Sequence, residues 1–154
     1  MDEVKKQIES LFPKLNDSDF KITSKPSNKY NCVGFAADDE GEESRWWWPK
    51  TDQYRGFWPE DVPEEESLEA FIQAFQTLGY EVCDSEELET EYEKIAIYTD
   101  ESGCPTHVAK QKGTKWKSKL GQSHDITHET LEGLKGYRYG SVAEIMKRRR
   151  RPNQ

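Results

Sequence analysis

Long apolar runs are missing from this chain of 154 residues. No stretch approaches the roughly 18 apolar residues that a membrane-spanning helix needs, and residues 1–15 lack the apolar segment of a secretory signal. Cysteine is scarce as well, because the chain has only three, widely spaced and odd in number, which do not form a disulfide framework. We therefore expect a cytoplasmic protein with free thiols and without membrane association.

Aliphatic side chains are also few. Hydrophobic residues make up only 33% of the chain, whereas aromatic residues reach 12% and supply large buried areas in their place. The length predicts one domain with one core, and neither an internal repeat nor a long linker divides it. Within this single domain, 1–154, we distinguish an N-terminal helix at 1–15, an aromatic and acidic insertion at 40–66, and a basic tail at 147–154.

Positive charge is concentrated in that tail. Residues 147–151 are all Lys or Arg, which leaves 17 basic against 30 acidic side chains in the rest of the chain, a balance of −13. An acidic body repels phosphate backbones, so we expect no nucleic-acid partner. The tail itself is expected to be solvated or to end a helix.

Apolar side chains at helical spacing predict helices in three regions. The first helix lies within 1–15 and stops at Pro13, and the second follows the N-cap Ser67 and stops before Gly79. A last helix is predicted from the apolar positions between 142 and 146, and it leads into the basic tail.

The predicted strands lie between the second and the last of these helices. Residues 94–98 and 108–111 form a hairpin around the turn at 100–103, residues 115–119 add a third strand, and 80–83 form a short one. Residues 124–128 are expected to form a loop that leads to a further strand. Helices first and an antiparallel meander last describe an α+β fold.

Cys32 is the most informative residue of the chain. It follows Asn31, a residue type that caps helices, and precedes small and apolar residues, so a helix is expected to begin at Cys32. The partial positive charge of unpaired amides at such a position lowers a cysteine pKa from about 8.5 towards neutrality, and the thiolate is the nucleophile. The competing interpretation makes Cys32 a small core residue.

A histidine in a suitable place accompanies this cysteine. His107 opens the strand predicted after Cys104 and Pro105, and this position has no other explanation in the sequence. A thiol and an imidazole of this kind are the nucleophile and the general base of a thiol hydrolase. The two residues together predict a Cys-His hydrolase without naming its substrate.

These residues also carry a resemblance to a known family. A helix-borne cysteine in Tyr-x-Cys-x-Gly, followed by a histidine that opens a strand of an antiparallel sheet, resembles the papain-like thiol hydrolases of the NlpC type and their amidase relatives. More narrowly, the chain is similar to a group of small uncharacterised bacterial proteins. That similarity rests on Asn31-Cys32-Val33-Gly34-Phe35-Ala36, Thr106-His107-Val108-Ala109, Trp116-x-Ser118-Lys119-x-Gly121 and Ile126-x-His128.

The resemblance implies a papain-like fold, with the cysteine at a helix start packed on a C-terminal antiparallel sheet. It implies that Cys32 attacks an amide, peptide or ester carbonyl, that His107 takes and returns the proton, and that Tyr30 stands near the oxyanion. A third polar residue orients the histidine in such enzymes. Ser118 and His128 are nearly equal candidates for that role, and His124 is a weaker one.

Tryptophans fill the insertion that follows the cysteine helix. They could line a substrate groove, or they could supply the bulk of a core that has few aliphatics. We expect at least two of the four to be structural. These residues are Trp46, Trp47, Trp48 and Trp58.

Two other classes of function compete with the hydrolase. Cys104 and His107 have the spacing of half a zinc site, but a second close pair is lacking apart from His124 and His128, so we expect neither a metal nor a cofactor. A papain-like domain without catalytic activity could instead recognise a protein or peptide partner through its groove. The leading expectation is a cysteine-dependent hydrolase or acyl transferase with a peptide, amide or acyl substrate.

Overall fold

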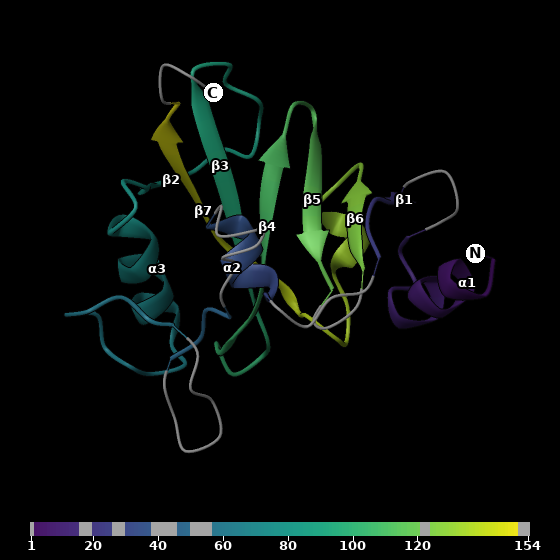
Figure 1. Cartoon of the computed structure of the whole chain (residues 1–154), viewed down its shortest axis with the longest axis horizontal. Helices are drawn as coiled ribbons and strands as arrows, with labels where there is room; N and C mark the ends of the chain where they lie inside the picture. The colour runs from purple at the N-terminus through teal and green to yellow at the C-terminus, as the bar shows by residue number, and fades with distance from the viewer. Residues whose placement is uncertain are drawn as a thin grey trace.

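The structure, a computed structural model, describes residues 2–15, 20–25, 30–37, 46–49, 57–120 and 124–150. It is an α+β arrangement built on one seven-stranded sheet, as Figure 1 shows. The helices are α1 (Asp2–Leu11), α2 (Cys32–Ala36) and α3 (Leu68–Gln76), with a 3₁₀ turn η1 at Glu132–Leu134. Among the described helices, none is long and apolar enough to cross a bilayer.

The strands β3 to β6 follow one another as an antiparallel meander, and β1, β7 and β2 complete the sheet. The spatial order is β1-β6-β5-β4-β3-β7-β2, and every pairing between these strands is antiparallel. Their bounds are β1 (Phe20–Ile22), β2 (Glu81–Cys83), β3 (Tyr92–Thr99), β4 (Pro105–Lys112), β5 (Lys115–Lys119), β6 (Asp125–His128) and β7 (Ser141–Arg149).

The pairing of β4 changes along its length. It pairs with β3 from Pro105 to Lys110, but with β5 only from Lys110 to Lys112. Among the described residues, the first half of β4 therefore has no strand partner on its β5 side, and α2 packs against β4 and β5. Figure 1 shows α2 lying across β4 in front of the sheet.

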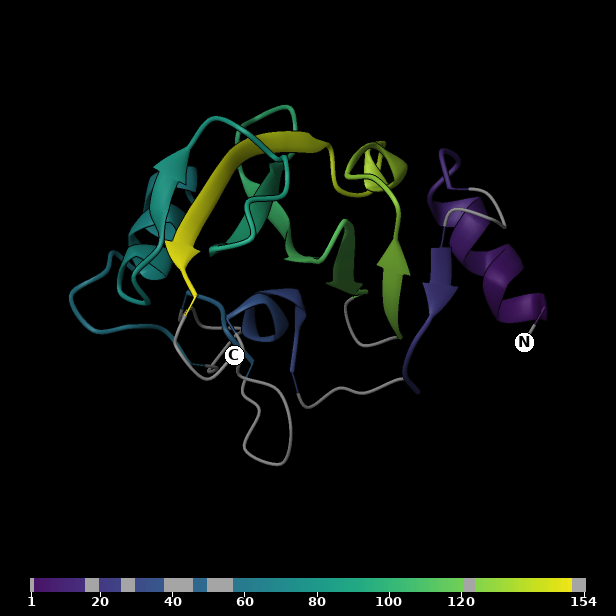
Figure 2. The same cartoon turned by 90° about the horizontal axis from the view of Figure 1, so that it is seen from above.

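Two hydrophobic clusters cover the two faces of the sheet. The first joins α2, the aromatic segment and α3 to Ile95, Ile97, Val108 and Met146. The second joins α1 to Ala96, Tyr98 and Ala109, which alternate with residues of the first cluster along β3 and β4. Figure 2 shows α1 beside β1 at one end of the sheet and α3 at the other end.

The local signals for the longer helices are confirmed. The helix α1 lies within 1–15, where Ile8 and Phe12 are buried. The helix α3 begins after Ser67, whose side chain accepts a hydrogen bond from the amide of Ala70 at 3.1 Å. These signals depend on residues within one or two turns, which is why the sequence alone reveals them.

The predictions for the end of the chain are wrong. Residues 142–146 belong to the strand β7, because pairing with β3 from Tyr92 to Thr99 replaces helical hydrogen bonds. Residues 125–128 form the strand β6, where a loop was expected. The start of the basic tail lies inside β7, and Arg148 pairs with Glu93 at 2.8 Å across to β3. Residues 151–154 lie outside the described residues.

Candidate functional site

The short helix α2 is held in place by the residue that caps it. Oδ1 of Asn31 accepts hydrogen bonds from the amide of Gly34 at 2.9 Å and from the amide of Trp47 at 3.0 Å. Its Nδ2 donates to the Trp47 carbonyl at 2.6 Å. All five residues of α2 are buried. The predicted cap is confirmed, and the same side chain links Trp47 of the aromatic insertion to α2, which ends at Ala36.

Cys32 is the first residue of α2 and is only 7% exposed. Burial is the largest influence on its thiol and raises the pKa to about 11. Backbone amides of Val108, Val33 and Cys32 donate hydrogen bonds to the sulfur, and with the positive charge of Lys119 they act in the opposite direction. The predicted lowering of this pKa is wrong here, because removing the sulfur from water outweighs all four favourable contacts.

His107 is fully buried on β4 against two tyrosines. Its ring stacks on Tyr139, with centroids 4.1 Å apart and planes 9° apart, and meets Tyr98 edge-on at 5.4 Å. Burial, followed by the nearby charge of His128, holds the pKa of the His107 imidazole well below its ordinary value of 6.5. The imidazole is therefore neutral near pH 7 and is held in one plane.

A chain of hydrogen bonds lies behind His107. Its Nε2 is 2.9 Å from Oγ of Ser118 on β5, and this Oγ is 2.8 Å from Nε2 of His128 on β6. Nδ1 of His128 is 2.8 Å from the carbonyl oxygen of Thr130. Ser118 and His128 were alternatives in the sequence, and the structure joins them in series. We call this chain the His107–Ser118–His128 relay.

The Thr130 carbonyl decides where the protons of the relay lie. A carbonyl oxygen only accepts, so Nδ1 of His128 carries a proton, and burial lowers the pKa of His128 to about 4, which leaves its Nε2 bare. Ser118 then donates to His128 and accepts from Nε2–H of His107. Nδ1 of His107 remains a buried lone pair without a hydrogen-bond partner in the part of the chain that the structure describes.

The structure brings Cys32 to the residue next to His107 but does not bond the two side chains. The thiol contacts the amide of Val108 and packs in the cluster that contains Val108. The imidazole projects towards the other cluster, beside Tyr98, since successive strand residues point to opposite faces. The sulfur and the imidazole thus lie on opposite faces of β4, and among the described residues no hydrogen bond joins them.

The hydroxyl of Tyr30, the residue expected near an oxyanion, is engaged in this structure, and its role at an oxyanion stays a prediction. This hydroxyl donates to the carboxylate of Asp125, whose oxygens lie 3.1 and 3.3 Å away. Nζ of Lys119 lies 5.3 Å from the centre of the Tyr30 ring, and Lys119 is opposite Asp125 in the β5–β6 register. The proton that an oxyanion donor would need is engaged by the Asp125 carboxylate.

Lys119 is a site residue that the sequence reasoning missed. It is fully buried, and burial lowers the pKa of its ammonium group, whereas Asp125 and Cys32 raise it. The signal was available, because Lys119 follows Ser118 in the strand and therefore points to the opposite face, towards Cys32. A buried cation next to a buried thiol favours any negative charge that develops on the sulfur.

Of the four tryptophans in the insertion, Trp47 and Trp58 are buried in the core, and Trp46 and Trp48 are half-buried. Trp47 and Trp58 are each 3% exposed and belong to the first cluster, and Trp48 packs edge-on against Phe71 with centroids 5.2 Å apart. The expectation that at least two are structural is confirmed. A groove-lining role for the half-buried Trp46 stays a prediction, and residues 40–45 and 50–56 of the insertion lie outside the described residues.

Where the structure describes the chain, the remaining cysteines and His124 form no hydrogen bond with the residues of the relay. Cys104 is exposed in the β3–β4 turn, and Cys83 is half-buried in β2. His124 is half-buried before β6, and its carbonyl accepts from the amide of Leu120 at 3.0 Å. Within the described ranges, no three His, Cys, Asp or Glu side chains are grouped to hold a metal ion.

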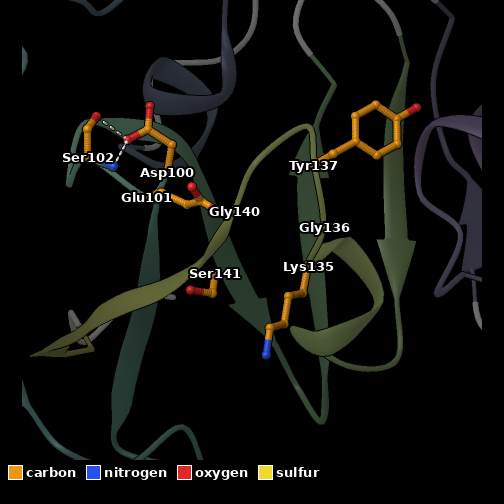
Figure 3. A pocket seen from close by; sticks show the side chains of 8 residues that line it. All are labelled: Asp100, Glu101, Ser102, Lys135, Gly136, Tyr137, Gly140 and Ser141. Carbon is orange, nitrogen blue, oxygen red and sulfur yellow. Dashed lines mark hydrogen bonds between the residues drawn. The ribbon is translucent and has the colours of Figure 1, made fainter.

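A surface cavity of about 690 Å³ lies between the β3–β4 turn and the loop before β7. Its lining includes Asp100, Lys135 and Tyr137. Figure 3 shows that the side chains of Lys135 and Tyr137 point away from each other, and Asp100 turns to Ser102, whose hydroxyl donates to it at 2.7 Å. The polar groups do not converge on one point, so this cavity carries no site.

Together these contacts define an α+β domain in which a buried cysteine at a helix start meets the strand of a relay-held histidine. Residues 21–147 match the family described as "Domain of unknown function (DUF7689)", and the chain belongs to this family. The matched range contains Cys32 and the complete relay. Neither the curated proteins nor the solved structures contain a match to the chain.

Proposed function

We propose that this protein is a cysteine-dependent hydrolase or acyl transferase of papain-like type that acts on an amide, peptide or ester bond. The single observation that carries the proposal is the proton arrangement of the His107–Ser118–His128 relay. It leaves Nδ1 of His107 as an unprotonated base in a buried place, one residue from the amide that touches the Cys32 sulfur. A base held in one tautomer is what a thiol nucleophile requires.

The proposed chemical step requires the Cys32 thiol and Nδ1 of His107, which point to opposite faces of β4 in this structure, to come together at the β4 backbone. The Cys32 sulfur leaves the Val108 amide and attacks the substrate carbonyl carbon, while its proton passes to Nδ1 of His107. The imidazolium then returns this proton to the nitrogen or oxygen of the leaving group, and a thioester remains on Cys32. Water or a second nucleophile, deprotonated by the same Nδ1, releases the acyl group.

The relay and the buried surroundings have separate parts in this step. Oγ of Ser118 accepts from Nε2–H and so stabilises the imidazolium as it forms. The raised pKa of Cys32 and the lowered pKa of His107 keep the resting pair neutral, so the proton moves during attack and no ion pair exists beforehand. The thiol nucleophile determines the type of reaction, which is acyl transfer, and the proposal names no particular acyl group.

The test uses an activated ester, p-nitrophenyl acetate, on protein with Cys83 and Cys104 replaced by serine, because these two thiols are more accessible than Cys32. We expect release of p-nitrophenolate and one acetyl group on Cys32 by intact mass. Cys32→Ser should remove the acylation, and His107→Ala should slow it by about 10²- to 10⁴-fold. Equal rates in all variants would overturn the proposal.

A binding module is the second candidate function. The observation that favours it is the buried thiol with a raised pKa and without a hydrogen bond to His107. In that case Cys32 is a packing residue, and the ester should acylate it only after unfolding in urea. Acylation of the folded protein that depends on His107 excludes this alternative.

A further inference from the structure

Lysines are concentrated on the sheet face that carries α2, although the chain as a whole has a net charge of −8. Successive strand residues point to opposite faces, so every second residue of β4 shares the face of Val108, which packs in the first cluster. After Val108 on β4, and along the whole of β5, all positions on this face are lysines. They are Lys110 and Lys112 on β4, and Lys115, Lys117 and Lys119 on β5.

The β4–β5 register places these lysines opposite one another. Lys110 is opposite Lys117, and Lys112 is opposite Lys115. The row of the first pair continues through Thr127 of β6 to Lys21 of β1. Like charges directly opposite each other destabilise a sheet, so strand pairing alone does not explain this double row. We call Lys21, Lys110, Lys112, Lys115 and Lys117 the lysine face.

The charges of the lysine face are close enough to act on one another. Burial, followed by positive charges that include Lys112 and Lys117, lowers the pKa of Lys110 to about 8. At the margin of the face, Glu129 pairs with Lys115 at 3.3 Å. A further anion bound between the two rows of lysines would reduce their mutual repulsion.

The lysine face leads towards the Cys32 thiol. Lys110 is two residues, or about 7 Å of strand, from Val108, whose amide contacts the sulfur. Nζ of Lys117 lies 5.8 Å from the centre of the Phe35 ring in α2. Figure 1 shows no described helix in front of β5 or β6, so no such helix covers the sheet beside α2. Exposure falls along this route: Lys112 and Lys115 are exposed, Lys110 and Lys117 are half-buried, and Lys119 is buried.

An acidic peptide fits this face better than a nucleic acid does. Alternate side chains of an extended peptide lie about 7 Å apart, which is also the spacing of the two lysine pairs along β4 and β5. The bases of a single-stranded nucleic acid need aromatic rings to stack on. Tyr30 and Phe35, the rings beside this face, stack on each other with centroids 6.0 Å apart and have lysine ammonium groups over them. The face therefore offers positive charge without a stacking platform.

We infer that the lysine face binds an extended acidic peptide segment, and that Cys32 acts on peptides or proteins with Asp or Glu side chains near the bond that is attacked. The statement about the substrate rests on the proposed function, whereas binding requires only the charges. Carboxylates of alternate peptide residues lie at the successive lysine pairs, and the peptide backbone continues towards α2.

The binding test uses fluorescein-labelled hexaglutamate and hexalysine, with fluorescence anisotropy at about 20 mM salt. The net charge of −8 by itself favours hexalysine, whereas the lysine face predicts that hexaglutamate binds and that added salt weakens its binding. Replacing two lysines in Lys112→Gln/Lys117→Gln should weaken the binding by about 3- to 30-fold. The double variant Lys112→Arg/Lys117→Arg keeps both charges and should bind like the wild type.

Lys6→Gln/Lys14→Gln is the matched control, because it removes the same charge from exposed residues of the segment 2–15, which packs in the second cluster. It should bind hexaglutamate like the wild type. The inference is overturned if hexaglutamate does not bind, if the control loses as much affinity as Lys112→Gln/Lys117→Gln, or if the arginine variant also loses binding. Tighter binding of a single-stranded DNA of equal charge overturns the choice of a peptide. Circular dichroism checks that each variant is folded.

The substrate test compares p-nitrophenyl esters of an acetylated triglutamate and of the corresponding glutamine peptide, with Cys83 and Cys104 replaced by serine. The acidic ester should acylate Cys32 faster, and Lys112→Gln/Lys117→Gln should remove this advantage. Equal rates for the two esters overturn the substrate class while the hydrolase proposal stands. If neither these esters nor p-nitrophenyl acetate acylates Cys32, the proposed function has failed, and bound hexaglutamate then identifies a binding site alone.

Discussion

Oγ of Ser118 lies 2.9 Å from Nε2 of His107, although the two residues are 11 positions apart and on different strands. The strands β4 and β5 are paired only further along, so the side chains meet where the backbones have separated. This contact fixes the protonation of the histidine, and several of the expected outcomes below depend on it.

The first prediction concerns the tautomers of the buried histidines. Nitrogen chemical shifts at neutral pH should show His107 protonated at Nε2 and His128 protonated at Nδ1, as the Thr130 carbonyl requires. Ser118→Ala removes the group between them, so His107 should gain a substantial population protonated at Nδ1. An unchanged His107 tautomer in Ser118→Ala would show that the serine does not set it.

The second prediction is a loss of stability in acid. The unfolded chain protonates its histidines near pH 6.5, whereas the folded pKa of His128 is about 4 and that of His107 is also lowered. As the pH falls from about 6.5 to about 4, only the unfolded state gains these protons, so unfolding becomes easier by about 3 kcal/mol for His128 alone. Urea unfolding across this range measures the change.

His128→Gln isolates the contribution of that one imidazole. The variant should lose less stability between neutral and acidic pH than the wild type, because glutamine does not titrate. His124→Gln is the control, since it leaves both buried imidazoles in place, and it should follow the wild-type pH dependence. Identical slopes for His128→Gln and the wild type would contradict a buried neutral His128.

The third prediction concerns Lys119. Its positive charge favours the Cys32 thiolate, so Lys119→Met should raise the thiol pKa above its value of about 11 and slow iodoacetamide alkylation at about pH 9. Lys117→Met is the matched control on the same strand, because its Nζ lies over the Phe35 ring at 5.8 Å. Equal alkylation rates in the two variants would show that Lys119 does not influence the Cys32 thiol.

The fourth prediction concerns Asn31, which caps α2 and also binds both backbone groups of Trp47. Asn31→Ala leaves these groups buried and unpaired, and should destabilise the protein by about 2–4 kcal/mol. Ser67→Ala removes only the cap of α3 and should cost about 1 kcal/mol. Equal costs in denaturant unfolding would mean that the link to Trp47 is unimportant.

The fifth prediction compares two glycines with positive φ. Gly113 has φ of +61° and open space around it, so Gly113→Ala should cost about 1–2 kcal/mol from backbone strain alone. Gly140 has φ of +76° and lies against the Thr99 carbonyl, so Gly140→Ala should cost about 3 kcal/mol or more. Similar costs for both in urea unfolding would contradict the close approach of this loop to β3.

Local sequence signals predicted much of the fold. The Asn31 and Ser67 caps, the helices α1 and α3, and the β3–β4 hairpin follow from residues that are neighbours in the chain. The end of the chain was mistaken because Val142, Ile145 and Met146 fit a helix as well as a strand. Only pairing with β3, far away in sequence, selects the strand.

The candidate site was predicted in its residues but not in its connections. Cys32, His107, Ser118 and His128 were identified by type and position, and strand alternation would have placed Lys119 opposite Ser118. The order of the relay depends on the register of β4, β5 and β6, which no short segment contains. Tyr139 gave no signal, because its contact with His107 joins two distant parts of the chain.

The sequence by itself determined which groups are available for chemistry, since a cap, a thiol and a strand-opening imidazole are properties of short segments. Only the tertiary structure decided their protonation. The backbone amides that donate to the Cys32 sulfur, together with Lys119, favour a thiolate. The packing of two clusters against β4 nevertheless removes water and raises the thiol pKa to about 11. Desolvation depends on every neighbour in space, so it becomes known only once the chain has folded.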